Sequence, residues 1–203
     1  MPSPNRSSRK KTVALSDDLK HIAANTVSVL SKDGTISDDD YRWVIEPADD
    51  AQDDTTQDTA TVPSIAADEH LLVSTENLSL LAQTTGKKGV LLTVTDDVQA
   101  LLTEQRLSLD TLDIVAINFA NFNDGRGYSF ASLLRRAGYT GELRAVGDVF
   151  KDTLFYMKRC GFDSYVLKAD KSLDEAKSGL TAFTQGYQAT EAQAASHFQV
   201  GTR

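Results

Sequence analysis

Two short stretches of the chain hold residue types that suit anion binding or acid–base chemistry. The longer stretch reads Asp124, Gly125, Arg126, Gly127, Tyr128, Ser129, and the shorter one reads Gly147, Asp148. In the longer stretch the glycines permit tight backbone turns, the arginine supplies a planar cationic fork, and two hydroxyls follow it. The pattern predicts a cradle for sulfate, sulfite or phosphate.

The same loop also has an interpretation without any ligand. Asp124 would cap backbone amides, and Arg126 would pair with an acid such as Asp148. The sequence leaves both interpretations open. It argues against a dinucleotide fingerprint, because Phe130 stands where the third glycine would open the helix.

Asp148 and Arg144 extend the candidate site. Asp148 is expected either to cap a helix that starts near Lys151 or to act as a base or a ligand. Arg144 lies in a short apolar strand, so we expect a buried guanidinium that needs a carboxylate or an anion as its partner. A small enzyme that processes an anion would use Asp124 or Asp148 as its acid or base. Arg126 and Arg144 would then stand beside that acid or base.

Alternating strands and helices must position these loops. Apolar runs predict strands at residues 90–94, 114–119, 143–146 and 165–167, with helices between them at residues 97–104, 129–137 and 151–160. Such alternation implies parallel pairing through right-handed crossovers, which brings both loops to the carboxyl edge of the sheet. We therefore predict an α/β fold whose parallel sheet has four or more βα units, either as an open flavodoxin-like sheet or as a half-barrel.

A small β-hairpin and a final helix flank these units. Apolar and polar residues alternate around Asp33 and Gly34, a pair typical of a tight turn. Ser172 and Glu175 form a capping box, and apolar residues recur behind it at helical spacing: Leu173, Ala176, Leu180, Phe183 and Tyr187. This stripe is expected to cover one face of the sheet.

The chain is expected to form one domain with polar extensions. Residues 1–25 are predicted to be a flexible basic arm, residues 26–187 a single α/β domain, and residues 188–203 a flexible tail. Within the domain, residues 47–63 hold five aspartates and almost nothing apolar, so we expect a flexible acidic loop there.

Composition narrows the classes of partner. A net charge of −8 and a pI of about 4.8 argue against nucleic acid, which attracts clustered lysine and arginine. No apolar run approaches the roughly 20 residues of a membrane span. The single cysteine, Cys160, is expected to be a small core residue, and its solitude fits a reducing cytoplasm. The histidines show no metal-ligand spacing and no flavin or nicotinamide motif stands out, so we expect neither metal nor cofactor.

At these same residues the chain resembles a known family. The runs that carry the resemblance are residues 117–129, 133–135, 141–149 and 157–163. The most specific of them reads Gly141, Glu142, Leu143, Arg144, Ala145, Val146, Gly147, Asp148, Val149. Together they resemble the proteobacterial family called domain of unknown function 934, which is described as involved in sulfite reduction and found beside sulfate-assimilation genes. The likeness covers about residues 27–187.

The resemblance implies an accessory protein of assimilatory sulfate and sulfite reduction, which would dock on the sulfite reductase haemoprotein or on its electron donor. An acidic surface would steer such a protein to a basic partner. The family has no established catalytic residue or cofactor. Where it usually has Glu, Pro and Lys, this chain has Asn118, Ala120 and Asn121, which removes a carboxylate and an amine.

A degenerate receiver-like interaction domain is a further alternative. Asp96 and Asp97 follow the first strand of the predicted units, and Lys168 ends the last strand, as in a receiver. Asn118 stands where a phosphorylatable aspartate would be needed.

Overall fold

The computed structural model describes residues 27–45, 65–168, 171–183 and 190. The predicted arm at residues 1–25 and the predicted acidic loop at residues 47–63 lie outside the described residues. The predicted tail at residues 188–203 also lies outside them, apart from residue 190. These three assignments, and the single domain that they delimit, therefore stay predictions.

One eight-stranded sheet organises the described chain. Its strands are β1 (Ser28–Ser31), β2 (Ile36–Asp38), β3 (Arg42–Val44), β4 (Leu71–Ser74), β5 (Lys88–Leu92), β6 (Ile114–Phe119), β7 (Glu142–Gly147) and β8 (Ser164–Tyr165). They lie in the order β2-β1-β8-β7-β6-β5-β4-β3. β3 to β8 are all parallel, and the β1–β2 hairpin joins β8 in antiparallel pairing. The α/β fold and the hairpin at Asp33 and Gly34 are confirmed.

The sheet is strongly curled. Its two edge strands, β2 and β3, follow each other in the chain, and only residues 39–41 separate them. A link of this length reaches at most about 14 Å. Eight strands laid flat would hold their edges about 34 Å apart. The sheet must therefore bend round until its edges approach, which makes it a half-barrel and not an open sheet.

The order of the parallel strands excludes the receiver-like alternative. From β3 to β8, each new strand is added on the same side of the one before it. A receiver has a doubly wound sheet whose strand order reverses at a switch point. Asp96, Asn118 and Lys168 do lie at strand ends, but in a sheet without such a reversal.

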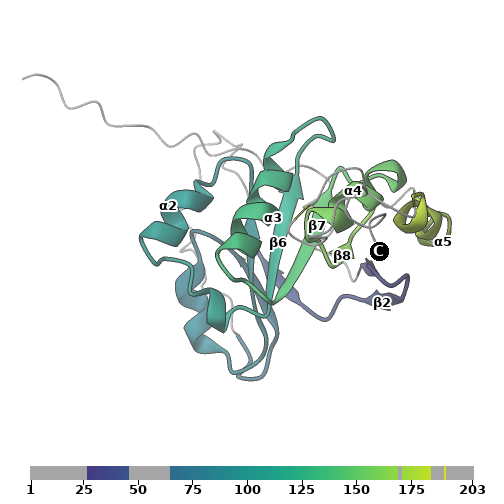
Figure 1. Cartoon of the computed structure of the whole chain (residues 1–203). Helices are drawn as coiled ribbons and strands as arrows, with labels where there is room; N and C mark the ends of the chain where they lie inside the picture. The colour runs from purple at the N-terminus through teal and green to yellow at the C-terminus, as the bar shows by residue number, and fades with distance from the viewer. Residues whose placement is uncertain (1–26, 46–64, 169–170, 184–189, 191–203) are drawn as a thin grey trace, which may run out of the picture.

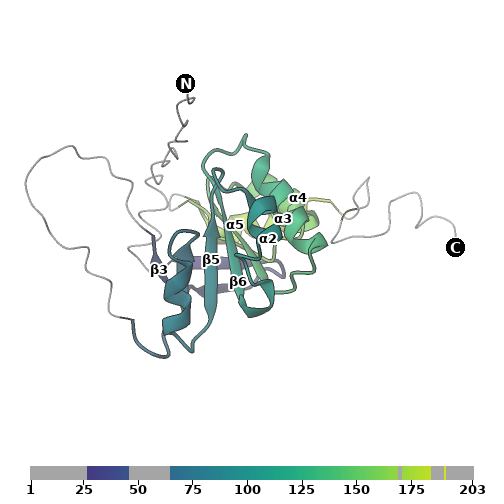
Figure 2. The same ribbon diagram turned by 90° about the vertical axis from the view of Figure 1, so that its left-hand side faces the viewer.

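Because each right-handed crossover advances in the same direction, the helices cover a single face of the sheet. They include α2 (Val98–Thr103), α3 (Arg126–Arg136), α4 (Leu154–Arg159) and α5 (Leu173–Ala176). Figure 1 shows α3 in front of β6, and Figure 2 shows α2, α3 and α4 together on one side of the strands. The 3-10 turns η1 (Leu78–Gln83), η2 (Leu109–Thr111), η3 (Lys151–Thr153) and η4 (Lys177–Thr181) complete the connections.

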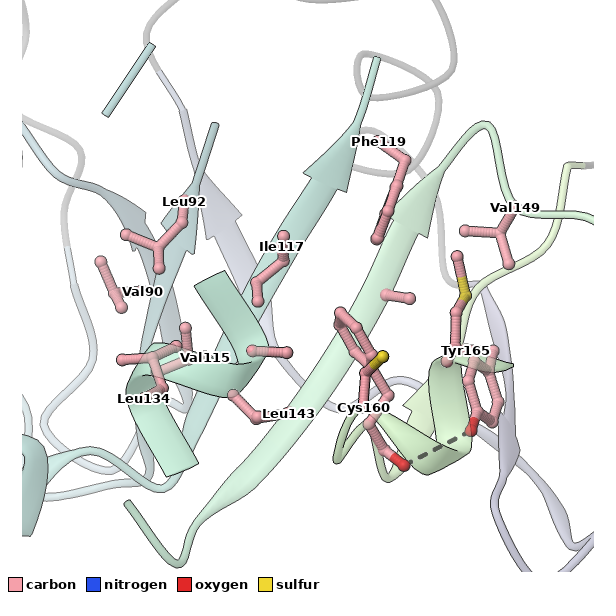
Figure 3. Packing of buried hydrophobic residues seen from close by; sticks show 14 of the residues in the cluster. Val90, Leu92, Val115, Ile117, Phe119, Leu134, Leu143, Val149, Cys160 and Tyr165 are labelled. Carbon is pink, nitrogen blue, oxygen red and sulfur yellow. Dashed lines mark hydrogen bonds between the residues drawn. The ribbon is translucent and has the colours of Figure 1, made fainter. Parts of the chain in front are cut away.

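Each strand contributes side chains to two separate cores, because alternate side chains point to opposite faces of the sheet. On β6, Val115, Ile117 and Phe119 pack under the helices, whereas Ile114 and Ala116 pack inside the curl. Figure 3 shows the helix-side core, in which Leu134 of α3 lies over the strands. Buried strands of this kind read as continuous apolar runs, which is why their position was predictable.

Two local predictions at the helices need correction. α3 begins at Arg126, three residues before its predicted start, so the arginine belongs to the first helical turn and not to a loop. In the final helix, Ser172 does accept a hydrogen bond from the Glu175 N–H. Phe183, however, is 66% exposed and lies outside the apolar stripe that it was predicted to extend.

Cys160 lies in the helix-side core, as predicted, and is labelled in Figure 3. Burial raises the pKa of its thiol. A thiol with a raised pKa is a poor nucleophile, because the thiolate is the reactive form. Cys160 therefore serves packing.

Candidate functional site

The carboxyl ends of β4 to β8, with the loops that follow them, form one edge of the half-barrel, which we call the carboxyl rim. The loop between β6 and α3 stands at the top of Figure 1. Ligand sites of barrels and open α/β sheets occupy this edge, because the loops there vary while the strands hold them rigidly. Most of the predicted site residues lie at this rim, whereas Arg144 is buried within β7.

Arg126 pairs with an acid of its own loop. Its Nε donates to Asp124 Oδ1 at 2.9 Å, its Nη2 donates to Asp124 Oδ2 at 2.6 Å, and its Nη1 donates to the Val94 carbonyl at 2.9 Å. The Arg126 hydrogen bond holds the pKa of the Asp124 carboxyl below its usual value. The predicted pairing of Arg126 with an acid is therefore confirmed, but the acid is Asp124 and not Asp148. The arginine instead fastens the β6–α3 loop to the loop that follows β5.

The two glycines of this loop play different roles. A Cβ on Gly127 would lie 2.5 Å from the Phe119 ring, so Gly127 lets α3 approach the end of β6. Gly125 has a φ of −72° and open space around it. Any residue can adopt that conformation. The turn at this position therefore does not require a glycine, although the sequence predicted that it would.

Tyr128 and Ser129 diverge from each other. Tyr128 is half-buried, and its ring lies 5.1 Å from the Phe119 ring and 5.0 Å from the Tyr156 ring. Burial raises the pKa of its phenol. Ser129 is exposed in the first turn of α3. The two hydroxyls that the sequence grouped as one cradle therefore face different surroundings.

Asp148 joins three strand ends at the rim. Its Oδ2 accepts a hydrogen bond from the Phe122 N–H at 2.8 Å, and its Oδ1 lies 2.7 Å from Lys168 Nζ. Its own N–H donates to the Phe119 carbonyl at 2.7 Å. The helix after β7 has Phe150 at its N-cap, so the prediction that Asp148 caps it is wrong. Asp148 instead links the loops that follow β6, β7 and β8.

A third carboxylate at the rim, Asp96, had no role in the predicted site. Its Oδ2 accepts from the Thr93 N–H at 2.6 Å and from the Thr93 hydroxyl at 2.8 Å, and its Oδ1 accepts from the Thr75 hydroxyl at 2.7 Å. It therefore ties the end of β4 to the end of β5. Its position directly after a predicted strand was the signal that could have placed it in the site.

Asn118 lies near the carboxyl end of β6, and its side chain faces the inside of the curled sheet. It shares the face of Ala116 on β6, is buried, and its Oδ1 has no hydrogen-bond partner among the described residues. Gly147 lies directly against it, since a Cβ there would be 2.5 Å from Asn118 Oδ1. A buried amide oxygen without a donor is costly unless a ligand or a water supplies one.

Arg144 lies away from the rim, in the amino-terminal half of β7. Its Nη1 donates to Asp39 Oδ1 at 2.7 Å, and its Nη2 donates to Glu142 Oε1 at 2.9 Å. Burial opposes the charge of the guanidinium, but the two carboxylates outweigh it and raise its pKa. The expected carboxylate partner is present, and the structure does not bring Arg144 together with Arg126 or Asp148.

The described residues hold no cluster of three or more histidine, cysteine, aspartate or glutamate side chains suited to a metal ion. Within the same part of the chain, no helix has the length and apolarity needed to cross a bilayer.

Comparison with known proteins agrees with the resemblance noted in the sequence. A family model described as a bacterial protein of unknown function (DUF934) matches residues 89–198, which is more than half of the chain. No curated protein and no solved structure matches it. The match includes β5 to β8 and the loops that carry Asp96, Asp124, Arg126 and Asp148. The chain belongs to the DUF934 family of bacterial proteins.

Proposed function

We propose that this chain is an accessory protein of assimilatory sulfate and sulfite reduction, and that it works through its carboxyl rim. The pathway follows from the family resemblance. The rim supports an accessory role because its carboxylates are already engaged in holding the strand ends together. Asp124, Asp148 and Asp96 each accept at least two hydrogen bonds or ion pairs, which suits a rigid recognition surface better than an acid or base that must exchange protons.

The observation that carries the docking role is Phe122. Its side chain is 51% exposed at the rim, although large apolar residues are normally buried. It is nevertheless held in place, since Asp148 accepts its N–H and its ring meets Phe150 edge-on at 5.7 Å. Lys168 lies over the same Phe150 ring at 5.8 Å. A fixed, exposed ring beside charged groups is the usual anchor of a protein interface.

The partner in this proposal is the sulfite reductase haemoprotein or its electron donor. A net charge of −8 favours a partner with a basic docking face, because complementary charge speeds the encounter. Phe122 would then enter an apolar pocket of that partner. The rim charges around the ring would fix its orientation.

The test is growth of a deletion strain on sulfate or on cysteine as the sole sulfur source. We expect loss of growth on sulfate, normal growth on cysteine, and rescue by the wild-type gene but not by Phe122→Ala. Tyr156→Ala is the matched control, because it removes a ring that is also 51% exposed, from helix α4. Purified partners should bind the wild type at least tenfold more tightly than Phe122→Ala, since an anchor residue contributes about 2 kcal/mol or more.

Normal growth of the deletion strain on sulfate, in a background without a second copy, contradicts the pathway. Full rescue by Phe122→Ala contradicts the docking surface but leaves the pathway standing. The two parts of the proposal are therefore judged separately.

A small oxyanion site at Arg126 is the second part of the proposal. The guanidinium is 58% exposed, and its hydrogen bonds to Asp124 and to the Val94 carbonyl leave one N–H on each Nη for a further acceptor. The N–H groups of a guanidinium lie in one plane, an arrangement that suits the oxygens of sulfate or sulfite. The first turn of α3 adds backbone N–H groups beyond that of Arg126, which donates to Asp124 Oδ1 at 3.0 Å.

Thermal shifts should reveal this site. Sulfate or sulfite should raise the melting temperature of the wild type above its value in chloride at equal ionic strength. The difference should vanish in Arg126→Ala and shrink in Arg126→Lys, since a point charge cannot offer the planar fork. Equal anion-specific shifts in the wild type and in Arg126→Ala would show that no oxyanion binds there.

A further inference from the structure

A hollow of about 910 Å³ opens at the edge of the half-barrel opposite the rim. The end of α3, the end of α4, the loop before β8 and the turn η4 surround it, and Lys32 reaches it from the β1–β2 turn. Its volume falls within the range of about 300 to 1,000 Å³ that small-molecule sites occupy. The proposed docking and oxyanion residues take no part in it.

The lining of this hollow is basic in an acidic protein. It includes Lys32, Arg135, Lys158 and Arg159, against the single carboxylate Asp163. Cations therefore outnumber carboxylates among the described residues that line the hollow, whereas the whole chain carries −8. A local reversal of charge in a concave site concentrates anions there.

Arg135 and Asp163 form the frame of the hollow. The five N–H groups of the guanidinium donate to the carbonyls of Tyr139, Gly141 and Gly161 and to Asp163. Asp163 also lies 2.6 Å from Lys32 Nζ. Arg135 therefore satisfies carbonyls at helix ends and has no N–H left for a ligand.

Lys158 takes no part in the hydrogen bonds and ion pairs of Arg135 and Asp163. It is half-buried near the end of α4, and no ion pair among the described residues includes it, although it interacts electrostatically with the Asp33 carboxylate of the β1–β2 turn. Lys32 has one carboxylate neighbour and a side chain that is 57% exposed. Helix dipoles favour cations at the C-terminal ends of helices. They do not explain why Lys32 reaches the hollow, because Lys32 comes from a β-turn and not from a helix end.

The hollow also has an apolar part. Phe162 and Leu180 are buried in its wall. Phe155 and Phe183 lie on its border with ring centroids 5.1 Å apart, and Phe183 is exposed. An exposed ring that packs on a second ring at the mouth of a basic hollow has the composition of a site that takes an apolar body.

We propose that this hollow binds an organic anion in which a carboxylate, sulfonate or phosphate group is attached to an aromatic or acyl body. The anionic group lies against Lys158 and Lys32. The apolar body lies along Phe155 and Phe183. This inference does not depend on the proposed role of the rim.

The naphthalene sulfonate dye 8-anilinonaphthalene-1-sulfonate has this chemistry and reports its own binding by fluorescence. We expect saturable binding of one dye molecule per full-length chain. Lys158→Gln should weaken binding about three- to tenfold, because it removes one partly exposed charge from the anion. Phe183→Ser should weaken it by a similar factor, because it removes the apolar wall.

Two variants serve as controls, Lys87→Gln and Tyr156→Ser, since each removes a comparable exposed group outside the hollow. Neither should change the affinity for the dye. The four exchanged side chains are all partly or largely exposed, so each variant is expected to fold, and its circular dichroism spectrum and melting temperature verify this. N-phenyl-1-naphthylamine, which lacks the sulfonate, should bind at least tenfold more weakly than the dye.

Three results overturn the proposal. The first is absence of saturable dye binding to the wild type. The second is an equal affinity of the hollow variants and the control variants. The third is equally tight binding of the neutral naphthylamine, which would leave an apolar hollow without selectivity for anions.

Discussion

Arg144→Met should lower the free energy of unfolding by about 3 to 5 kcal/mol, the usual loss when one partner of a buried ion pair is removed. The side chains of Arg144 and Asp39 are only 6% and 2% exposed. Methionine fills similar space but leaves the Asp39 carboxylate buried without its cation. Urea denaturation followed by circular dichroism measures the loss.

The position of this pair explains the size of the effect. Asp39 belongs to residues 39–41, the short link between the two edge strands of the sheet. It also accepts a hydrogen bond from Trp43 Nε1 at 2.7 Å. The ion pair with Arg144 therefore fastens the link to β7, in the middle of the sheet, and holds the sheet in its curl.

Two further variants test this explanation. Lys32→Met breaks an ion pair whose lysine is 57% exposed, and it should cost less than about 1 kcal/mol. Asp39→Asn combined with Arg144→Met removes both charges, and it should recover at least half of the loss. A loss below about 1 kcal/mol for Arg144→Met alone would mean that solvent reaches Asp39 and that the pair does not hold the curl.

Gly147→Ala should lower the free energy of unfolding by about 2 to 5 kcal/mol, because two penalties add. Its φ of +91° is unfavourable for any residue with a Cβ. A Cβ there would also lie 2.5 Å from Asn118 Oδ1 and 2.6 Å from the Phe119 carbonyl oxygen. The amide can rotate, but the carbonyl cannot move without disturbing β6.

Gly138→Ala separates the two penalties. Gly138 has nearly the same φ, +89°, but no atom lies within 4 Å of the position of its Cβ. It should lose only the conformational part, about 1 to 2 kcal/mol. Equal losses in the two variants would show that the end of β7 shifts to admit a side chain. Anion and partner binding by Gly147→Ala would then report how rigid the rim must be.

Much of the fold follows from local patterns in the chain. The continuous apolar run at residues 114–119 predicts a buried parallel strand, and β6 occupies those residues. Asp33 and Gly34 predict the turn of a hairpin, and Asp33 Oδ1 accepts the Thr35 N–H there at 2.9 Å. Asp97 precedes the predicted second helix and caps it. Such features are readable because their energies depend on residues a few positions apart.

The partners of the charged residues required the tertiary structure. Arg144 called for a carboxylate, but any of 29 acidic residues could have supplied it. Asp39, 105 positions away, became its partner only because the sheet curls. Asp148 likewise finds the Phe122 N–H and Lys168 because β6, β7 and β8 end side by side.

Residue types and spacing thus determined the positions of β5 to β8, the turn of the hairpin and the approximate positions of the helices between the strands. Strand order and curvature decided which loops meet, and they placed Arg144 buried within β7 and Arg126 at the carboxyl rim. The physical reason is that an ion pair forms wherever the folded backbone brings opposite charges within about 4 Å. That proximity is set by the packing of the whole sheet, which brings together residues far apart in the chain. It therefore cannot be predicted from a short stretch of sequence.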